Sequence, residues 1–356
     1  MDYALIIAGG SGTRLWPLSR RNRSKQSLKL VGERTMFQHA IDRLATLFQP
    51  DRIFVVTRQD QSALLSSQVP DLPSTNFINE PEGRGTAPAI GLAAIHLRHT
   101  DPQATMAILT ADHFITNREQ FCRVLEAAFQ SARDGHLVTL GIKPASPSTG
   151  FGYIHHGDSL GMVNGFQVYR VEHFTEKPEL ELARQMVAGG TYSWNSGMFI
   201  WRVDRILEEF RLQMPAFFTQ LMEVETSLGT PEYKEVLSRV WSQVAEQTID
   251  YGVMEHAADV TVIPVDIGWT DVGSWASLGE LLAPDQDGNI FTGPHVARDT
   301  RNTLVFVEKK LVATIGVQDL VIVDTPDALL VCAKGREQEV RQIVEQLKAS
   351  GNDKWL

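Results

Sequence analysis

Short apolar runs alternate with longer amphipathic stretches over roughly the first 143 residues. Unbroken apolar runs predict strands that are buried on both faces, because such strands lose the polar alternation of half-exposed ones. These runs lie at residues 3–8 (YALIIA), 52–57 (RIFVVT), 106–110 (MAILT) and 137–142 (LVTLGI). Helical periodicity lies between them, at residues 36–48, 89–98 and 118–132. Strands that alternate with helices predict an α/β fold with a mostly parallel, doubly wound sheet.

The pattern changes at Lys143, after which prolines and glycines separate short, partly alternating strands such as residues 166–174. We expect antiparallel strands and helices inserted over the carboxyl edge of the sheet, where open α/β folds place ligands. The periodicity predicts further helices at residues 179–188, 203–212 and 231–241. The sheet as a whole is therefore expected to be mixed.

A loop rich in Pro, Asp, Gly and Asn at residues 283–289 (APDQDGN) predicts a domain boundary. Beyond it, short β segments are expected at residues 303–308, 311–315, 320–324 and 328–332, followed by an amphipathic helix at 336–347. Short, evenly spaced strands favour a small β unit, such as a coil of parallel strands. We therefore predict a large domain over residues 1–285 and a small β-helix-like domain over residues 286–356.

Composition and charge exclude several classes of partner. The 356 residues carry a formal net charge of -10, and Lys and Arg are dense only over residues 14–29. That stretch is short for a nucleic-acid surface but suits a small polyphosphate ligand. No apolar run approaches the ~20 residues that span a bilayer, and the N-terminus has no signal-peptide pattern. The sequence predicts a cytoplasmic protein without a nucleic-acid or membrane partner.

The two cysteines, Cys122 and Cys332, each lie within an apolar segment. They could form one disulfide, but two buried free thiols in a reducing compartment are the favoured interpretation.

A glycine-rich loop follows the first predicted strand, at Gly9, Gly10, Ser11, Gly12 and Thr13. Glycines allow the backbone to approach phosphate oxygens and to present successive N–H donors to them. Two common phosphate motifs do not fit the loop. A P-loop requires GxxxxGK[ST], and a dinucleotide fingerprint requires a third glycine where Leu15 stands. The loop thus indicates a phosphate cradle of another kind, with a plain strand-to-helix turn as the alternative.

Four charged side chains could act beside such a cradle. Arg14 follows the loop directly, and its planar guanidinium suits phosphate binding. Lys25 could neutralise charge on a transferring phosphoryl group, although a solvated basic face would explain it equally well. Asp112 follows a buried strand and Asp271 lies between glycines, so both could bind Mg²⁺, which prefers carboxylates together with substrate phosphates. A helix cap and a turn residue are the respective alternatives for these two aspartates.

The loop, the lysine and the aspartates belong to a longer series of distinctive segments. The series is GGSGTRLWPLSR (9–20), NEPEGRGTAPAIGLAA (79–94), TADHFI (110–115), FGYI (151–154), EKP (176–178), WNSGMFIW (194–201), IDYGVME (249–255), DIGWTDVGSW (266–275) and DLVIVDTPDALLV (319–331). In this order, and over nearly the whole chain, these segments resemble the mannose-1-phosphate guanylyltransferases, or GDP-mannose pyrophosphorylases. The glycine loop alone is shared with many sugar nucleotidyltransferases.

The resemblance implies a nucleotide-diphospho-sugar transferase-like fold over residues 1–285 and a role for each matching residue. The backbone of Gly9 to Thr13 would cradle a triphosphate, and Arg14 and Lys25 would act in catalysis. Asp112 and Asp271 would hold Mg²⁺. The remaining roles are nucleotide binding by Glu80, Gly85 and Thr86, and sugar binding by Gly152, Glu176 and Asn195.

The implied reaction transfers a guanylyl group from GTP to mannose 1-phosphate and releases GDP-mannose and pyrophosphate. The alternatives are a nucleotidyltransferase of the same fold with another nucleotide or hexose 1-phosphate, and a non-catalytic sugar-nucleotide sensor. Retention of Lys25, Asp112 and Asp271 argues against the sensor. The resemblance also implies a short left-handed β-helix after residue 290, which could assist formation of a homodimer.

The sequence departs from the family's usual pattern at three positions. Ser24 stands where a proline is usual, and Ser27 stands where a phenylalanine is usual. Both changes are expected to loosen the loop that carries Lys25. Gly85 replaces a common asparagine and leaves base selectivity open. The 356 residues hold no phosphomannose isomerase module, which is fused to some relatives, so we expect the short form of the enzyme.

Overall fold

The computed structural model describes residues 1–10 and 12–356, which form two compact units. The first unit comprises Met1–Gly9, Ala40–Ala111 and Ile115–Trp269, and the second comprises Gly10–His39, Asp112–Phe114 and Thr270–Leu356. The predicted domain boundary between residues 285 and 286 stays a prediction. Among the described residues, no helix has the length and apolar character that a membrane span requires.

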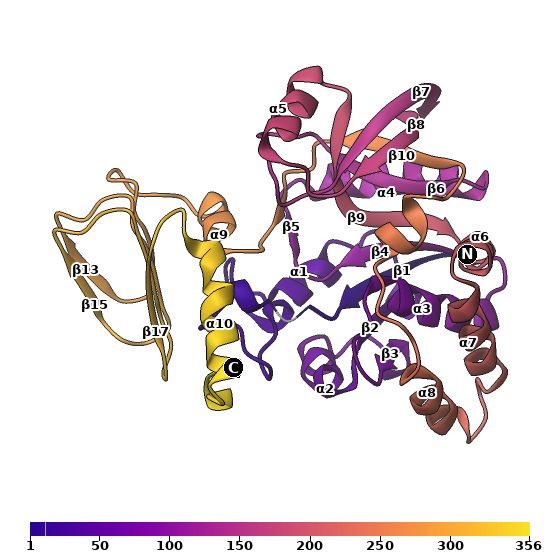
Figure 1. Cartoon of the computed structure of the whole chain (residues 1–356), viewed down its shortest axis with the longest axis horizontal. Coiled ribbons are helices and arrows are strands. Elements are labelled where there is room, and N and C mark those ends of the chain that lie inside the picture. The colour runs from indigo at the N-terminus through magenta and orange to yellow at the C-terminus, as the bar shows by residue number, and fades with distance from the viewer. Residues whose placement is uncertain (11) are drawn as a thin grey trace. The chain divides into compact units, whose positions relative to one another are not determined.

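One nine-stranded sheet forms the first unit, in the order β3-β2-β1-β4-β9-β6-β10-β8-β7 (Figure 1). Its strands are β1 (Asp2–Ala8), β2 (Ile53–Arg58), β3 (Phe77–Glu80), β4 (Thr105–Thr110), β6 (Leu137–Ile142), β7 (Tyr153–Val163), β8 (Phe166–Thr175), β9 (Tyr192–Arg202) and β10 (Val260–Val265). β1 is parallel to β2 and β4, whereas β9 is antiparallel to β4 and β6. The predicted mixed α/β sheet is confirmed.

Helices cover both faces of this sheet. They are α2 (Gln59–Gln68), α3 (Thr86–Thr100), α4 (Arg118–Arg133), α5 (Leu180–Gly189), α6 (Val203–Gln213), α7 (Pro215–Thr226) and α8 (Tyr233–Trp241). In one core cluster, Leu5 and Met106 of the sheet pack with Ile90 of α3 and Phe210 of α6. Successive side chains of β1 point to opposite faces, and both Leu5 and Ile6 are fully buried. This burial explains why the strand is an unbroken apolar run.

The region after Lys143 was predicted to form an insertion over the carboxyl edge of the sheet, and the structure differs from this prediction. Its strands β7 to β10 join the main sheet, and β9 lies near the centre, between β4 and β6. The centre of β9 reads WNSGM, which suggests a turn, yet Trp194, Phe199 and Trp201 are all buried there. Long-range pairing with two strands therefore outweighs the local turn signal.

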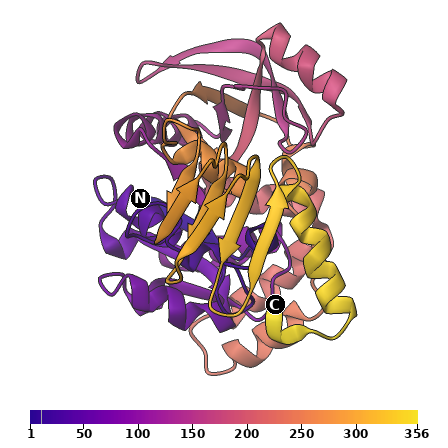
Figure 2. The same ribbon diagram turned by 90° about the vertical axis from the view of Figure 1, so that its left-hand side faces the viewer.

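Short strands follow one another in the C-terminal part of the second unit (Figure 2). They are β12 (Ile290–Thr292), β13 (His295–Arg298), β14 (Leu304–Val307), β15 (Val312–Ile315), β16 (Leu320–Asp324) and β17 (Leu329–Ala333). β12, β14 and β16 pair in parallel, as do β13 and β15, while β17 is antiparallel to β16. The predicted β-helix-like unit is confirmed. In Figure 2 its strands run from orange to yellow, and α10 (Val340–Ala349) follows them.

The second unit has its own apolar core, to which the N-terminal segment contributes. Trp275, on the short helix α9 (Trp275–Leu281), is fully buried and packs in one cluster with Trp16, Leu28 and Phe306. Its indole Nε1 donates to the backbone carbonyl of Trp16 (3.2 Å). This core fixes the backbone that follows the glycine loop and, through Val272, the backbone beside Asp271.

The remaining short elements connect these parts. α1 (Met36–Asp42) carries the chain from the second unit into the first, and β5 (His113–Ile115) pairs with β11 (Trp269–Asp271). Cys122 and Cys332 are both free and half-buried, so the favoured interpretation of two thiols is confirmed, although neither is fully buried.

Candidate functional site

Lys25 lies between two carboxylates of the second unit. It begins the short helix η2 (Lys25–Ser27), where its Nζ donates to Asp112 Oδ2 (2.9 Å) and Asp271 Oδ1 (3.2 Å). The Lys25 side chain is only 5% exposed, whereas those of Asp112 and Asp271 are 27% and 26% exposed. Residues from three distant positions in the sequence thus form one cluster, with both carboxylates reachable from solvent.

The charges of this cluster stabilise one another. Burial alone would lower the pKa of Lys25, but the two carboxylates outweigh it and raise the pKa above its usual value. Burial likewise favours a neutral Asp112, yet Lys25 and His113 hold the pKa of that carboxyl at about 2. The lysine is therefore a cation and Asp112 an anion at neutral pH. A solvated basic face does not describe Lys25.

The glycine loop is held against the lysine at one position. Gly12 has a φ of 60°, and a Cβ built there would lie 2.7 Å from the Cβ of Lys25. Only glycine fits such a left-handed backbone at so close an approach. Gly9 meets no such neighbour within 4 Å, and Gly10 faces the side-chain amide of Gln26. Ser11, expected to bind nucleotide, lies outside the described residues.

The serines predicted to loosen the Lys25 loop make contacts within it. The Ser27 hydroxyl donates to the Ser24 carbonyl (2.7 Å), and the Ser27 backbone N–H donates to the same oxygen (2.9 Å). Ser24 has a φ of -67°, the angle that a proline would impose. The backbone shape is therefore kept without the usual proline.

Arg14 contacts a different part of the second unit from Lys25. It is exposed within the helix η1 (Thr13–Leu15), and its guanidinium donates to Gln338 Oε1 (3.3 Å). Among the described residues it pairs with neither Asp112 nor Asp271. Its guanidinium has further N–H donors beside the one that contacts Gln338, so its predicted role in binding phosphate charge stays a prediction.

A second polar cluster, in the first unit, joins the residues expected to bind the sugar. The backbone N–H of Asn195 donates to the Gly152 carbonyl (2.8 Å). A Cβ added at Gly152 would lie 2.4 Å from Glu176 Oε2 and 3.5 Å from the Asn195 Cβ. Glu176 also pairs with Lys177 (2.5 Å). Gly152 thus leaves room for the carboxylate of Glu176, which directly follows β8, and for the Asn195 side chain on β9.

Asp250 also belongs to this group of residues, called the sugar cluster below, although no role was predicted for it from the sequence. Its Oδ1 accepts a hydrogen bond from Asn195 Nδ2 (2.6 Å), and burial raises its pKa against the effect of that bond. It begins a π-helical turn (Asp250–Met254), an irregularity that is common at functional sites. Asp250 lies in the segment IDYGVME, which resembles the family's pattern, but only the fold shows its contact with Asn195.

Glu80 ends strand β3 as a buried and incompletely paired acid. Its side chain is 4% exposed, and its Oε1 has no hydrogen-bond partner among the described residues. Burial raises its pKa to about 8, although Arg58 opposes the shift. A neutral carboxylic acid at pH 7 can donate a hydrogen bond, which a carboxylate cannot.

Gly85 and Thr86 are fixed by contacts with the segment around Gln247. Gly85 has φ 88° and ψ 178°, a conformation that is nearly exclusive to glycine. A Cβ at Gly85 would lie 2.3 Å from the Gln247 carbonyl oxygen, so the usual asparagine would not fit this backbone. The Thr86 hydroxyl accepts from the Ile249 backbone N–H (2.8 Å). The backbone that this loop adopts therefore requires the glycine that stands at position 85.

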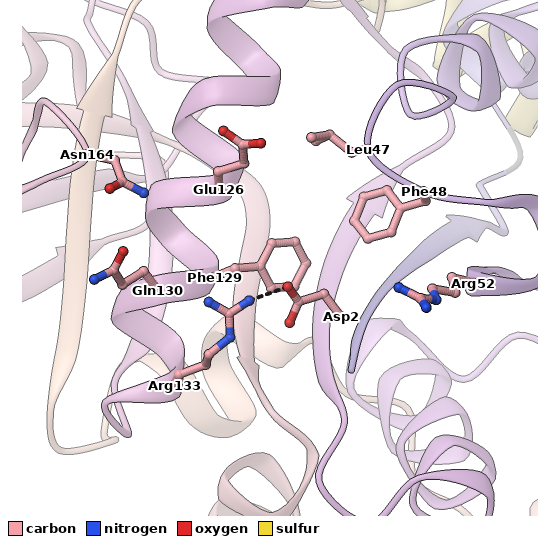
Figure 3. A pocket seen from close by; sticks show the side chains of 9 residues that line it. All are labelled: Asp2, Leu47, Phe48, Arg52, Glu126, Phe129, Gln130, Arg133 and Asn164. Atoms are coloured by element: carbon pink, nitrogen blue, oxygen red, sulfur yellow. Dashed lines mark hydrogen bonds and ion pairs between the residues drawn. The ribbon is translucent and has the colours of Figure 1, made fainter.

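Two hollows of the first unit differ in their relation to the expected site. One, of about 640 Å³, lies beside Glu80 along the chain and is lined by Arg58, Gln59, Asp60, Pro81, Glu82 and Gly83. The other, of about 340 Å³, lies at the amino end of β1, where Asp2 pairs with Arg133 (Figure 3). It contains none of the residues expected in the site, and ligands of open α/β sheets bind at the carboxyl ends of strands.

The comparisons with known proteins first define a class. The family profile described as nucleotidyl transferase matches residues 3–287, and one described as a mannose-phosphate isomerase/GMP-like β-helix domain matches residues 293–347. Because the first profile covers most of the chain, the protein belongs to the class of nucleotidyltransferases.

Individual relatives define the family within this class. A mannose-1-phosphate guanylyltransferase of Salmonella typhimurium is 42% identical over 98% of this chain and 74% of its own length. One from Escherichia coli K12 is 40% identical over the same shares. The crystal structure of a Thermus thermophilus protein named mannose-1-phosphate geranyltransferase shares 34% identity, covers 98% of this chain and 99% of its own, and has a TM-score of 0.88. The chain belongs to the mannose-1-phosphate guanylyltransferase family.

The buried acid Glu80 predicts a pH-dependent stability. Its pKa is about 8 in the folded protein and near 4.5 when exposed, so the folded chain keeps a proton that the unfolded chain releases between these values. Its contribution to stability therefore falls as pH rises from 4.5 to 8. Glu80→Gln should match the wild type near pH 5 and exceed its unfolding free energy near pH 8, by on the order of a few kcal/mol.

Denaturant unfolding across this pH range measures the difference. Glu82→Gln is the matched control, because Glu82 is exposed two residues away and should change stability equally at every pH. A difference between Glu80→Gln and wild type that stays constant with pH would contradict the neutral, buried acid.

Proposed function

We propose that this chain transfers the guanylyl group of GTP to α-D-mannose 1-phosphate, giving GDP-mannose and pyrophosphate. The observation that carries the proposal is the buried Lys25 ammonium shared by Asp112 and Asp271, in a chain of this family. The second unit would supply the phosphate and metal chemistry. The first unit would supply sugar and base binding.

The proposed reaction is an in-line displacement at the α-phosphorus. A phosphate oxygen of mannose 1-phosphate forms a bond to the α-phosphorus of GTP, and the bond to the bridging α–β oxygen breaks. Pyrophosphate leaves with that electron pair. The nucleophile is already an anion at neutral pH, so no general base is required. Positioning and charge neutralisation would then supply the catalysis.

Lys25 and the glycine loop would stabilise the charge that develops on the phosphates. Lys25 is preorganised, because burial and two ion pairs hold its side chain in one place. The close approach of Gly12 to Lys25 keeps the loop backbone next to this cation. Preorganised charge costs little reorganisation during reaction, which is why such groups contribute strongly to rate. Arg14, which follows the loop directly, would add a second cation.

Asp112 and Asp271 fit the requirements of a magnesium site. They come from separate segments of the chain, both contact the Lys25 ammonium, and both remain partly exposed. Mg²⁺ favours one or two protein carboxylates together with substrate phosphates. When bound, the ion would supply neutralisation of phosphate charge. Lys25 meanwhile would keep the two carboxylates from repelling each other.

The polar groups of the first unit suit the organic parts of the substrates. Glu176 and Asn195 present acceptors and donors to sugar hydroxyls, and Asp250 orients the Asn195 amide. A protonated Glu80 would donate a hydrogen bond to an acceptor of the base, and the adjacent hollow would admit that base. A cytoplasmic location and a homodimer remain expectations that accompany this proposal.

Removing the Lys25 ammonium should slow turnover while leaving the fold. We expect Lys25→Ala to lower kcat by roughly 10²–10³-fold, as does the loss of one preorganised electrostatic contact in other enzymes. Lys29→Ala is the matched control, because Lys29 is exposed and contacts only Glu33 among the described residues. It should keep the wild-type rate. Circular dichroism checks the fold of both. Near-normal turnover of a folded Lys25→Ala or Asp112→Ala variant would contradict the assignment.

A substrate panel tests the reaction itself. Four nucleoside triphosphates, each with mannose, glucose and galactose 1-phosphates, are scored by Mg²⁺-dependent pyrophosphate release. We expect kcat/KM for GTP with mannose 1-phosphate to exceed every other pair by roughly 100-fold, since sites that hydrogen-bond their substrate reject imperfect analogues strongly.

The panel also separates the alternatives. A faster reaction with another nucleotide or hexose 1-phosphate would indicate a related transferase. The loop at Gly85 would then be the candidate cause of the altered substrate specificity. Binding of GDP-mannose without turnover of any pair would indicate a sugar-nucleotide sensor. Either result would overturn the proposed reaction.

A further inference from the structure

The hairpin formed by β7 and β8 contains a bulge at Glu172. His155 of β7 faces His173 of β8, whereas the next residue, His156, faces Val171. Glu172 is therefore an extra residue in β8 that has no partner in β7. A β-bulge of this kind interrupts the alternation of side chains and re-aims the extra residue. In a regular strand, Glu172 and His173 would point to opposite faces.

The bulge brings three metal-binding side chains together. The Oε2 atom of Glu172 lies 2.5 Å from Nδ1 of His155, and the rings of His155 and His173 have centroids 4.9 Å apart. One ligand atom from each of His155, Glu172 and His173 lies within 4.8 Å of the others. The Nδ1 of His155 is buried and makes no well-aligned hydrogen bond with any described residue. Its polar neighbour is the Glu172 carboxylate.

The neighbours of the cluster orient its first ligand. The ring of Tyr192 on β9 stacks on His155, with centroids 4.4 Å apart and planes at 25°. His156 points elsewhere, because its Nε2 pairs with the Ser193 hydroxyl (2.9 Å) and its ring stacks on Tyr169.

We propose that His155, Glu172 and His173 form a binding site for a late first-row divalent metal ion, of which Zn²⁺ is the best fit. Two imidazoles and one carboxylate are a common three-ligand set for such ions, with water completing the coordination. Ligand atoms around tetrahedral zinc lie roughly 3.3 Å apart, given bonds of about 2.0 Å. Because Glu172 and His173 are exposed, small rotations of their side chains bring the three atoms to that spacing.

This site is chemically distinct from the carboxylate cluster of the second unit. Mg²⁺ prefers oxygen ligands and retains its water, whereas imidazole nitrogens favour zinc, copper, iron and nickel. An ion held by His155 and His173 would link β7 to β8. Since Tyr192 stacks on His155 and lies three residues before Asn195, the link would also stiffen the strand that carries the sugar cluster. The proposal does not depend on the identity of the substrates.

The test is metal binding to the whole protein in excess Mg²⁺, which keeps hard oxygen sites occupied. Zn²⁺ is titrated against a chromophoric chelator, and Co²⁺ is added to a parallel sample for its visible absorption spectrum. We expect one equivalent of Zn²⁺ to bind, and His155→Ala, His173→Ala and Glu172→Gln each to weaken binding by at least about tenfold. His256→Ala, which removes an exposed histidine of the same unit, should bind like the wild type.

Thermal unfolding provides a second readout that does not depend on activity. Binding to the folded state should raise Tm of the wild type by about a few degrees at saturating Zn²⁺, and should raise Tm of the folded His173→Ala variant less. Unchanged zinc affinity in all three ligand variants would overturn the proposal. So would the absence of stoichiometric binding of Zn²⁺ or Co²⁺ to the wild type at micromolar concentrations.

Discussion

The second unit depends on one electrostatic constraint, a buried ammonium that must be neutralised. Lys25 is almost inaccessible to solvent, and a lone charge in that position would cost several kcal/mol. Asp112 and Asp271 remove this penalty, and in return Lys25 allows two carboxylates to lie close together. The backbone follows from this arrangement, because Gly12 can approach the Lys25 side chain only without a Cβ. One triad of charges therefore determines the glycine loop, the lysine turn and the carboxylates as a group.

Full charges and hydrogen-bonding groups occur in different units of the chain. In the second unit, Lys25, Asp112 and Asp271 form a cluster of full charges. In the first, Gly152, Glu176, Asn195 and Asp250 form a hydrogen-bonded group, and Glu80 is a neutral acid. Phosphates are recognised chiefly by charge, whereas sugars and bases are recognised by directional hydrogen bonds. This difference explains why the phosphate residues could be named with simple charge arguments and the others only through the family resemblance.

Much of the fold could be predicted because strong periodicity leaves few alternatives. The strands at residues 137–142 and 320–324 lie at their expected bounds. α2 was missed because its sequence QDQSALLSSQ has almost no apolar face, with only Gln61 and Leu65 buried. β9 was missed because its WNSG segment resembles a turn and is stabilised by pairing on both sides. Asp250 could not be assigned, since its role arises from a contact with Asn195, 55 residues away. Sequence pattern specifies local elements, but such long-range partners are set by the tertiary fold.

If the proposed reaction is right, Asp112 and Asp271 share a divalent ion beside Lys25 when nucleotide binds. Anomalous diffraction from crystals of the protein with Mn²⁺ and a non-hydrolysable GTP analogue would locate that ion. We expect a manganese peak in contact with oxygens of both carboxylates and of the nucleotide phosphates, with Lys25 still adjacent. A nucleotide-bound structure with manganese on other residues, and with both carboxylates bound to Lys25 alone, would contradict it.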